Sequence, residues 1–173
     1  MIIRLDRIGD ESFAWRESLS VAAEELERQE LVGLGEVACY GRVTAISVGF
    51  LLEVRLSYEQ TLACVRCLAP IAEPVESKVE LVVSRPASEP PPGELELSES
   101  DLDSLFVDDK VLDTRPILLE QLQLNIPMRA LCREDCAGLC PECGVNRNDS
   151  ACDCGDRAVD PRWKALRAWS SKT

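Results

Sequence analysis

Strict alternation of apolar and polar residues predicts two neighbouring β-strands that each bury one face. The first lies between Glu36 and Thr44 and the second between Leu52 and Glu59. The apolar positions are Val37, Cys39, Gly41 and Val43 in the first strand, and Leu52, Val54, Leu56 and Tyr58 in the second. A turn around Ser47-Val48-Gly49 would join the two strands as a hairpin.

Two further stretches indicate more strands. In the segment 75–83 one face carries Val75, Ser77, Val79, Leu81 and Val83. The segment from Ile2 to about Leu19 has room for short strands, because Phe13 and Trp15 alternate with smaller or polar neighbours. Together these strands predict an antiparallel meander that is curled or partly barrel-like.

Helical patterns interrupt and follow the meander. The stretch 21–29 consists of good helix formers and predicts a short helix, which Leu31-Val32-Gly33-Leu34-Gly35 would break. A second helix is expected over 113–126, with Asp113 or Thr114 as its cap, Pro116 in its first turn and Pro127 at its end. Its apolar stripe consists of Leu118, Leu119, Leu122 and Ile126. Asp160-Pro161 would open a short terminal helix.

The segment 86–109 differs from the rest of the chain. It is rich in proline and carboxylates, and no basic residue lies between Ala87 and Asp109. Such a stretch repels itself and predicts an extended loop. We therefore expect an α+β chain with a β-rich core domain at 1–127, which includes the acidic loop, and a cysteine-rich zinc module with a terminal helix at 128–173.

Composition and charge narrow the possible functions. The 173 residues include 19 Lys and Arg against 31 Asp and Glu, and the net charge is -12. This balance argues against a simple electrostatic grip on RNA or an anionic membrane. Residues 128–173 nevertheless carry eight bases against seven acids, so a modest basic face is confined to the C-terminal part. The chain has no His, which excludes histidine bases and histidine metal ligands, and no sequence motif indicates an enzyme.

Nine cysteines carry the strongest chemical signal. Cys140-Pro141-Glu142-Cys143-Gly144 is typical of a zinc knuckle, whose tight turn directs backbone amides at the sulfurs while Gly144 supplies a positive φ. Cys152 and Cys154 can complete a site of four thiolates around Zn²⁺. Arg147 and Arg157 lie close in sequence and would offset the negative charge of that site.

Two other cysteine pairs leave the ligand assignment open. Cys64 and Cys67 form a second C-x2-C pair, and Cys132 and Cys136 form a C-x3-C pair. These four residues would make a second zinc site, or Cys64 and Cys67 would instead join Cys140 and Cys143. Cys39 lies in a strand and is expected to be a small buried apolar residue.

A structural metal site competes with two other interpretations of these cysteines. A thiol redox protein or sensor could also use C-x2-C pairs, but Pro70 and Pro74 follow Cys67, so the helix that such catalysts need does not open there. The spacings do not match the ferredoxin runs of iron–sulfur proteins. The charged start of the chain has no apolar leader, which predicts a cytoplasmic protein where metal is favoured over disulfides.

The cysteine segments resemble the YceD family of large-subunit ribosomal RNA accumulation proteins. Cys64-Val65-Arg66-Cys67-Leu68-Ala69-Pro70 is similar to the family signature C-x-R-C-L-x-P. The run from Cys136 to Gly144, the pair Cys152-x-Cys154 and the terminal Asp160-Pro161-Arg162-Trp163 resemble the extended form of the family.

This resemblance implies a non-enzymatic role in the synthesis, processing or stability of 23S ribosomal RNA. The implied partners are a large-subunit precursor, the 23S RNA itself or a basic ribosomal protein. The implied cofactor is one or two Zn²⁺ ions. Arg66 lies between two cysteines and is the candidate contact to a phosphate or partner, or a counter-charge to the thiolates.

Overall fold

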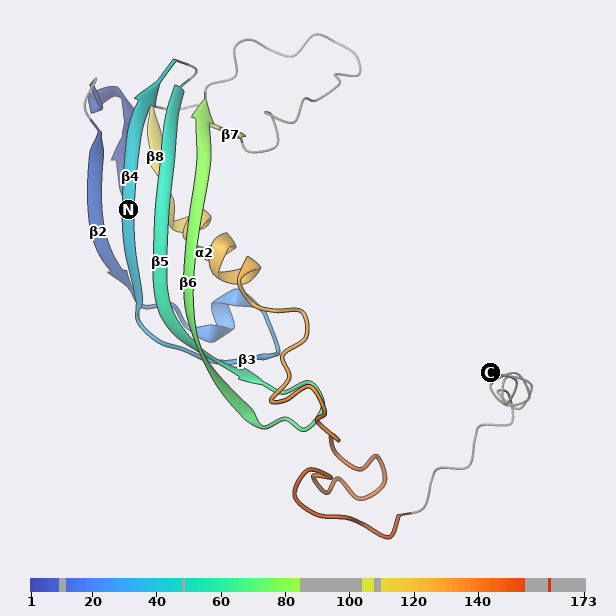
Figure 1. The fold of residues 1–173 in the computed structure, drawn as a ribbon. Coiled ribbons are helices and arrows are strands. Elements are labelled where there is room, and N and C mark those ends of the chain that lie inside the picture. The colour runs from blue at the N-terminus through green and yellow to red at the C-terminus, as the bar shows by residue number, and fades with distance from the viewer. Residues whose placement is uncertain (10–11, 48, 85–103, 108–109, 155–161, 163–173) are drawn as a thin grey trace.

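The computed structural model describes residues 1–9, 12–47, 49–84, 104–107, 110–154 and 162. Its main feature is a six-stranded sheet with the order β2-β4-β5-β6-β7, in which β3 pairs with β5 beside this path (Figure 1). The strands are β2 (Phe13–Leu19), β3 (Leu31–Leu34), β4 (Val37–Ile46), β5 (Gly49–Ala63), β6 (Pro70–Ser84) and β7 (Ser104–Phe106).

The strands β4 and β5 form the predicted hairpin, in which Ile46 pairs with Gly49. All eight apolar positions of the alternating pattern are buried. The strand β6 is longer than the expected 75–83 and contains Pro74. A proline fits there because β7 pairs only with residues 82–84 of β6, and among the described residues no strand pairs with the outer edge of β6 beside Pro74.

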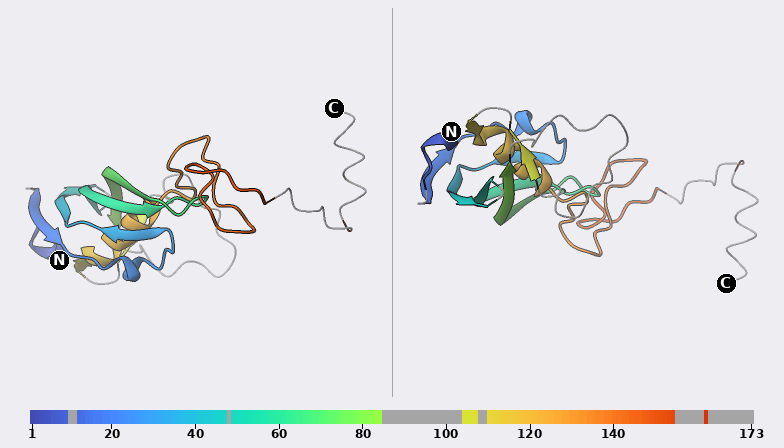
Figure 2. Two further views of the ribbon diagram at one scale, coloured as in Figure 1. Left: turned by 90° about the horizontal axis from the view of Figure 1, so that it is seen from below. Right: turned by 90° about the horizontal axis from the view of Figure 1, so that it is seen from above.

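One face of the sheet is covered by α2 (Thr114–Leu124), as both views in Figure 2 show. Asp113 caps the helix, because its side chain accepts a hydrogen bond of 3.1 Å from the backbone N–H of Arg115. The buried positions of the helix include Leu118 and Leu122, which pack in one hydrophobic core with the inward side chains of the sheet. The helix ends at Leu124, slightly earlier than expected, and Ile126 still packs in that core.

A small second sheet fixes the N-terminus to the start of the helix. It pairs β1 (Ile2–Arg4) with β8 (Val111–Asp113) in antiparallel fashion, and a 3-10 turn η1 (Leu5–Arg7) follows β1. Thr114 is buried, and its hydroxyl accepts a hydrogen bond of 3.0 Å from the N-terminal ammonium group. The predicted strands near the N-terminus are therefore β1 and β2.

The partly barrel-like form of the sheet is not confirmed, and its expected antiparallel order is only partly correct. The sheet is open, because among the described strands β2 and β7 lie at opposite edges and do not pair, and α2 fills the inner face that a barrel would close. The meander is also not wholly antiparallel, because β7 runs parallel to β6. A parallel pair needs a crossover of a dozen or more residues, and the segment 85–103 between these strands provides that length.

Two local predictions also failed. The stretch 21–29 contains only a 3-10 turn, η2 (Ala23–Leu26), because its two buried side chains, Val21 and Leu26, provide too little apolar stripe for a longer helix. The expected break at 31–35 is the strand β3. Directly after β3, Gly35 allows a close approach to β5, and its backbone N–H donates to the carbonyl oxygen of Glu59 at 2.8 Å.

Other expectations concern residues that the structure does not describe. They are the terminal helix from Asp160, most of the acidic loop and Arg157. Within the expected loop, Leu105 and Val107 pack partly against the core. In the part of the chain that is described, no helix has the length and apolar character needed to cross a membrane.

Candidate metal centres

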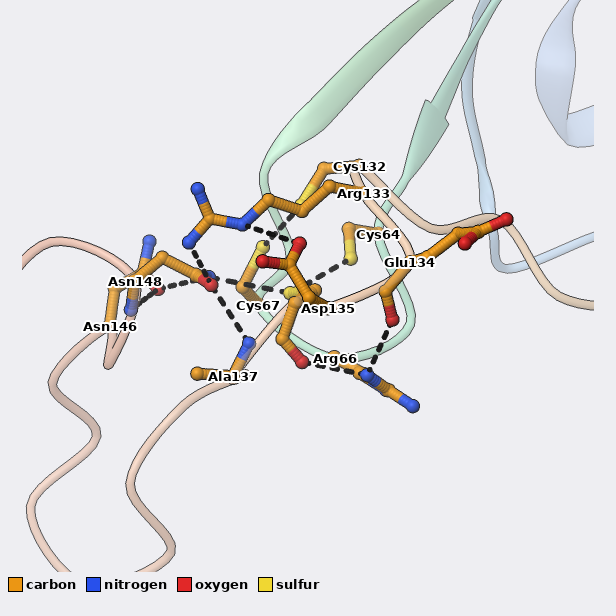
Figure 3. Close-up of polar contacts among 11 residues, drawn as sticks. Cys64, Arg66, Cys67, Cys132, Arg133, Glu134, Asp135, Ala137, Asn146 and Asn148 are labelled. Carbon is orange, nitrogen blue, oxygen red and sulfur yellow. Dashed lines mark hydrogen bonds and ion pairs between the residues drawn. The ribbon is translucent and has the colours of Figure 1, made fainter.

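Cys64 and Cys67 lie at the far end of the β5–β6 hairpin, beyond the helix (Figures 1 and 3). The turn between them is closed by two backbone hydrogen bonds. The N–H of Leu68 donates to the carbonyl oxygen of Cys64 at 2.9 Å. The N–H of Cys64 donates to the carbonyl oxygen of Ala69, also at 2.9 Å. This turn places both sulfurs on the same side of the hairpin end.

Cys132 and Cys136 complete a group of four sulfurs, which we call the first cluster. The chain leaves α2 and meets the hairpin, where the N–H of Val65 donates to the carbonyl oxygen of Ala130 at 3.0 Å. The Sγ atoms of Cys64 and Cys136 are 3.8 Å apart, and those of Cys67 and Cys132 are 3.6 Å apart. All four sulfurs lie within 4.8 Å of one another. The cluster therefore joins the sheet to the segment that follows the helix.

The second cluster consists of Cys140, Cys143, Cys152 and Cys154, whose sulfurs also lie within 4.8 Å of one another. Its turn repeats that of the first cluster. The N–H of Gly144 donates to the carbonyl oxygen of Cys140 at 2.9 Å. The N–H of Cys140 donates to the carbonyl oxygen of Val145 at 2.8 Å. Gly144 has the predicted positive φ, at 75°. In the first cluster Leu68 occupies this position, with a φ of 60°.

Both clusters fit a tetrahedrally bound metal ion. In a site of four thiolates with Zn–S distances of about 2.3 Å, neighbouring sulfurs are about 3.8 Å apart. The two sulfur separations in the first cluster, 3.8 and 3.6 Å, are close to this value. Four soft sulfur donors suit zinc or iron and are unsuitable for magnesium or calcium. Each donor set could thus hold either ion with sulfur at all four positions.

The protein favours a thiolate at one sulfur of each knuckle turn. Burial acts to raise the pKa of Cys64, but the backbone N–H groups of Cys132, Cys67 and Arg66 outweigh it and lower this pKa to about 6. The N–H groups of Cys143 and Glu142 lower the pKa of Cys140 to about 6 in the same way. Each knuckle thus directs the amides of its third and fourth residues at its first sulfur, as the sequence predicted.

Other sulfurs hold their protons more firmly. Burial is the main cause that raises the pKa of Cys132 to about 12, and the neighbouring sulfurs contribute as well. The hydrogen bond with Cys143 is the main cause that raises the pKa of Cys154 to about 12, and burial is the next largest cause. A metal ion that binds all four sulfurs must displace these protons, so its affinity falls as the pH falls.

Charged side chains next to the clusters act on them in different ways. Arg147 lies as predicted beside the second cluster, with its Nη2 atom 3.7 Å from the Sγ of Cys140. Arg66 uses its Nη1 atom to donate to the carbonyl oxygens of Glu134 at 3.2 Å and Cys136 at 2.8 Å (Figure 3). These bonds tie the hairpin to the loop that carries Cys132 and Cys136.

The structure thus separates the ligand sets that the sequence left open. It brings Cys64 and Cys67 to Cys132 and Cys136, and does not place them with Cys140 and Cys143. Cys39 is buried in β4, and burial raises its pKa to about 11. Sequence reasoning missed Asn148, whose Nδ2 atom lies 3.3 Å from the Sγ of Cys136, because no spacing rule marks an amide side chain in a loop as a partner of a distant sulfur.

Leu68 provides a test of the knuckle geometry. A left-handed φ costs a leucine about 1–2 kcal/mol relative to glycine, and the side chain of Leu68 is 65% exposed, so it gains little from packing. We expect Leu68→Gly to raise the free energy of unfolding by roughly 0.5–1 kcal/mol in thermal denaturation. The matched change Gly144→Ala should act in the opposite direction, since Gly144 has a similar φ. A loss of stability in Leu68→Gly would show that the leucine side chain contributes more than its backbone strain costs.

A model of a known protein family matches most of this chain. The family model described as large ribosomal RNA subunit accumulation protein YceD matches residues 52–168. This range includes both cysteine clusters and Arg66.

Individual relatives extend the comparison. A protein of Mycobacterium tuberculosis strain H37Rv is 32% identical over 127 residues, which cover 72% of this chain and 58% of that protein. A protein of Mycobacterium leprae is 27% identical over 125 residues, 72% of this chain and 55% of the relative. The chain thus spans little more than half the length of these relatives. The chloroplastic YCED homolog 1 of Arabidopsis thaliana, named as a large ribosomal RNA subunit accumulation protein, is 33% identical over 57 residues, 33% of this chain and 18% of that protein. No solved structure matches the chain.

Proposed function

Because this chain belongs to the YceD family, we propose that it is a non-enzymatic, zinc-stabilised factor that supports the synthesis, processing or stability of 23S ribosomal RNA in the cytoplasm. The observation that carries this proposal is the family match over residues 52–168, which spans most of β5, all of β6 and β7, the helix and both clusters. The name of the Arabidopsis relative points to the same process.

Zinc is proposed to act structurally at both clusters. Four thiolates fill all the positions of a tetrahedral ion, so no open position remains for water or substrate. The first cluster takes two ligands from the hairpin and two from the segment after α2, so an ion there would hold these parts together. This arrangement supports a role in folding and favours a function other than catalysis.

The charge of the chain bears on the choice of partner. A net charge of -12 opposes non-specific binding to RNA and is compatible with a basic ribosomal protein or with a local contact to a large-subunit precursor. Arg66 remains the proposed contact, because its hydrogen bonds to Glu134 and Cys136 use Nη1 and the residue is exposed. Figure 3 shows its guanidinium group at the edge of the first cluster.

A thiol redox function is the second candidate, and one observation favours it. Backbone N–H groups lower the pKa of the buried Cys64 to about 6, which favours its thiolate at neutral pH. However, each sulfur has three sulfur neighbours within 4.8 Å, whereas a dithiol catalyst needs a single pair. Elemental analysis and thiol counting on protein purified without air or chelator separate the two functions. Zinc with thiols that react only after chelation supports the structural role, and metal-free reversible disulfides support the redox role.

Depletion of the protein in its own cells tests the ribosomal role. We expect the ratio of 23S to 16S ribosomal RNA to fall and precursor large-subunit particles to accumulate in sucrose gradients. The intact chain should restore the ratio, and so should Cys39→Ala, which removes a thiol outside both clusters. The variant with Cys64→Ser and Cys67→Ser should fail to restore it. An unchanged ratio after full depletion would contradict the proposed function.

A further inference from the structure

Two consecutive residues contact sulfurs of different clusters. The Nη2 atom of Arg147 lies 3.7 Å from the Sγ of Cys140 in the second cluster. The Nδ2 atom of Asn148 lies 3.3 Å from the Sγ of Cys136 in the first cluster (Figure 3). One short stretch of backbone therefore connects the immediate surroundings of both candidate metal centres.

A small antiparallel ladder holds this stretch in place. Leu139 pairs with Asn146, and the N–H of Arg147 donates to the carbonyl oxygen of Gly138 at 2.9 Å. The ladder runs from the first cluster at Cys136 towards the second cluster at Cys140. A shift of one of its strands therefore moves residues beside both clusters.

The amide of Asn148 is fully engaged at the end of this ladder. Its Oδ1 atom accepts hydrogen bonds from the N–H of Ala137 at 2.8 Å and from Nη2 of Arg133 at 2.7 Å. Its Nδ2 group donates to the sulfur of Cys136 and to Oδ1 of Asn146 at 2.7 Å. These bonds fix which end of the amide faces the sulfur, so Asn148 is oriented as a donor to a thiolate.

The second cluster bounds the loop that carries Asn148. The residue lies in the loop between Cys143 and Cys152, and the sulfurs of that cluster come from both ends of the loop. An ion bound there would close the loop and restrict its residues. Without that closure, the ladder, the side-chain bonds and the backbone hydrogen bonds from Asp149 and Ser150 to the carbonyl oxygen of Asn146 would still hold the turn, but the two ends of the loop would be free to separate.

We propose that Asn148 couples the two clusters, so that a zinc ion in the second cluster holds the Asn148 amide on Cys136 and raises the affinity of the first cluster for its own ion. This proposal rests on the proposed binding of zinc at both clusters. Since coupling between two binding sites is reciprocal, an ion in the first cluster also favours binding at the second. Partners that orient a metal ligand without touching the metal typically change metal affinity about 10–100-fold.

Zinc titration of the full chain against a competing chelator tests this coupling. The variant Cys152→Ser with Cys154→Ser removes the second site, and we expect the first site to bind zinc at least about 10-fold more weakly than in the intact chain. Asn148→Ala should retain two ions per chain but weaken the first site to a similar extent. In the background that lacks the second site, Asn148→Ala should have little further effect, because the loop no longer holds the amide in place.

Asn148→Asp separates the contact to sulfur from a general effect on the loop. The aspartate keeps an acceptor for Ala137 and Arg133 but replaces the N–H donor to Cys136 with a negative charge. We expect it to weaken the first site in the intact chain. In the variant with Cys64→Ser and Cys67→Ser, which has no ion in the first cluster to couple to, it should leave the second site unchanged to within about twofold. Equal first-site affinity in the intact chain and in the variant without the second site would overturn the coupling. An intact chain that binds no zinc would instead overturn the zinc part of the proposed function.

Discussion

Replacement of Cys64 and Cys67 by serine is expected to remove one zinc ion and to lower the free energy of unfolding by about 4 kcal/mol. The ion at the first cluster acts as a cross-link between residues far apart in sequence. Cys67 and Cys132, whose sulfurs lie 3.6 Å apart, are separated by 65 positions. Closing a loop of this length in the unfolded chain costs about 4 kcal/mol of entropy. The midpoint of thermal unfolding should therefore fall by roughly 10 °C, as measured by calorimetry alongside elemental analysis.

The second cluster provides the matched control for this prediction. Cys152→Ser with Cys154→Ser should also remove one ion. The main core ends along the chain at Ala130, so the loop that this cluster closes contributes no side chain to it. Its loss should free the C-terminal loop and shift the main transition by no more than a few degrees. Equal shifts in the two variants would contradict the assignment of the first cluster as the clamp between the sheet and the C-terminal segment.

Local patterns were sufficient to predict much of the sheet and of each knuckle. The burial of Val37, Cys39 and Val43 on one face of β4 follows from the period of two, which any half-buried strand imposes. The knuckle at Cys140 follows from a motif of five residues, because the turn requires only local backbone geometry. These features depend on neighbours in sequence, and the sequence therefore contains the necessary information.

The remaining features depend on where distant segments meet. The pairing of Cys64 and Cys67 with Cys132 and Cys136 requires the chain to return from α2 to the end of the β5–β6 hairpin, and no local pattern encodes that path. The parallel strand β7 and the short strand β3 are set in the same way by contacts with β6 and β5. Glycines at 33 and 35 were interpreted as a break, although Gly33 is part of β3 and Gly35 allows the chain to approach Glu59 of β5 closely.

Gly41 is a position in the sheet where the addition of a single methyl group should have a large effect. Trp15 in β2 lies directly opposite Gly41 in β4, and both residues are buried. A Cβ atom at position 41 would lie 2.0 Å from Cζ2 of Trp15, well inside contact distance. Gly41→Ala should therefore lower the free energy of unfolding by about 3 kcal/mol, because the indole ring must leave its position in the core. Chemical denaturation monitored by tryptophan fluorescence measures both the loss and the movement of the ring.

A double-mutant cycle with Trp15→Ala identifies the cause of this loss. Trp15→Ala alone should cost about 3–5 kcal/mol, since it empties a buried site. In that background Gly41→Ala should cost less than about 1 kcal/mol, because the atoms that its methyl group would meet are gone. Gly33→Ala serves as the control for glycine in a strand, since its Cβ atom would meet Thr61 only at 3.7 Å. If Gly41→Ala were equally costly with and without the indole ring, the backbone of β4 rather than its contact with Trp15 would be what excludes a side chain at this position.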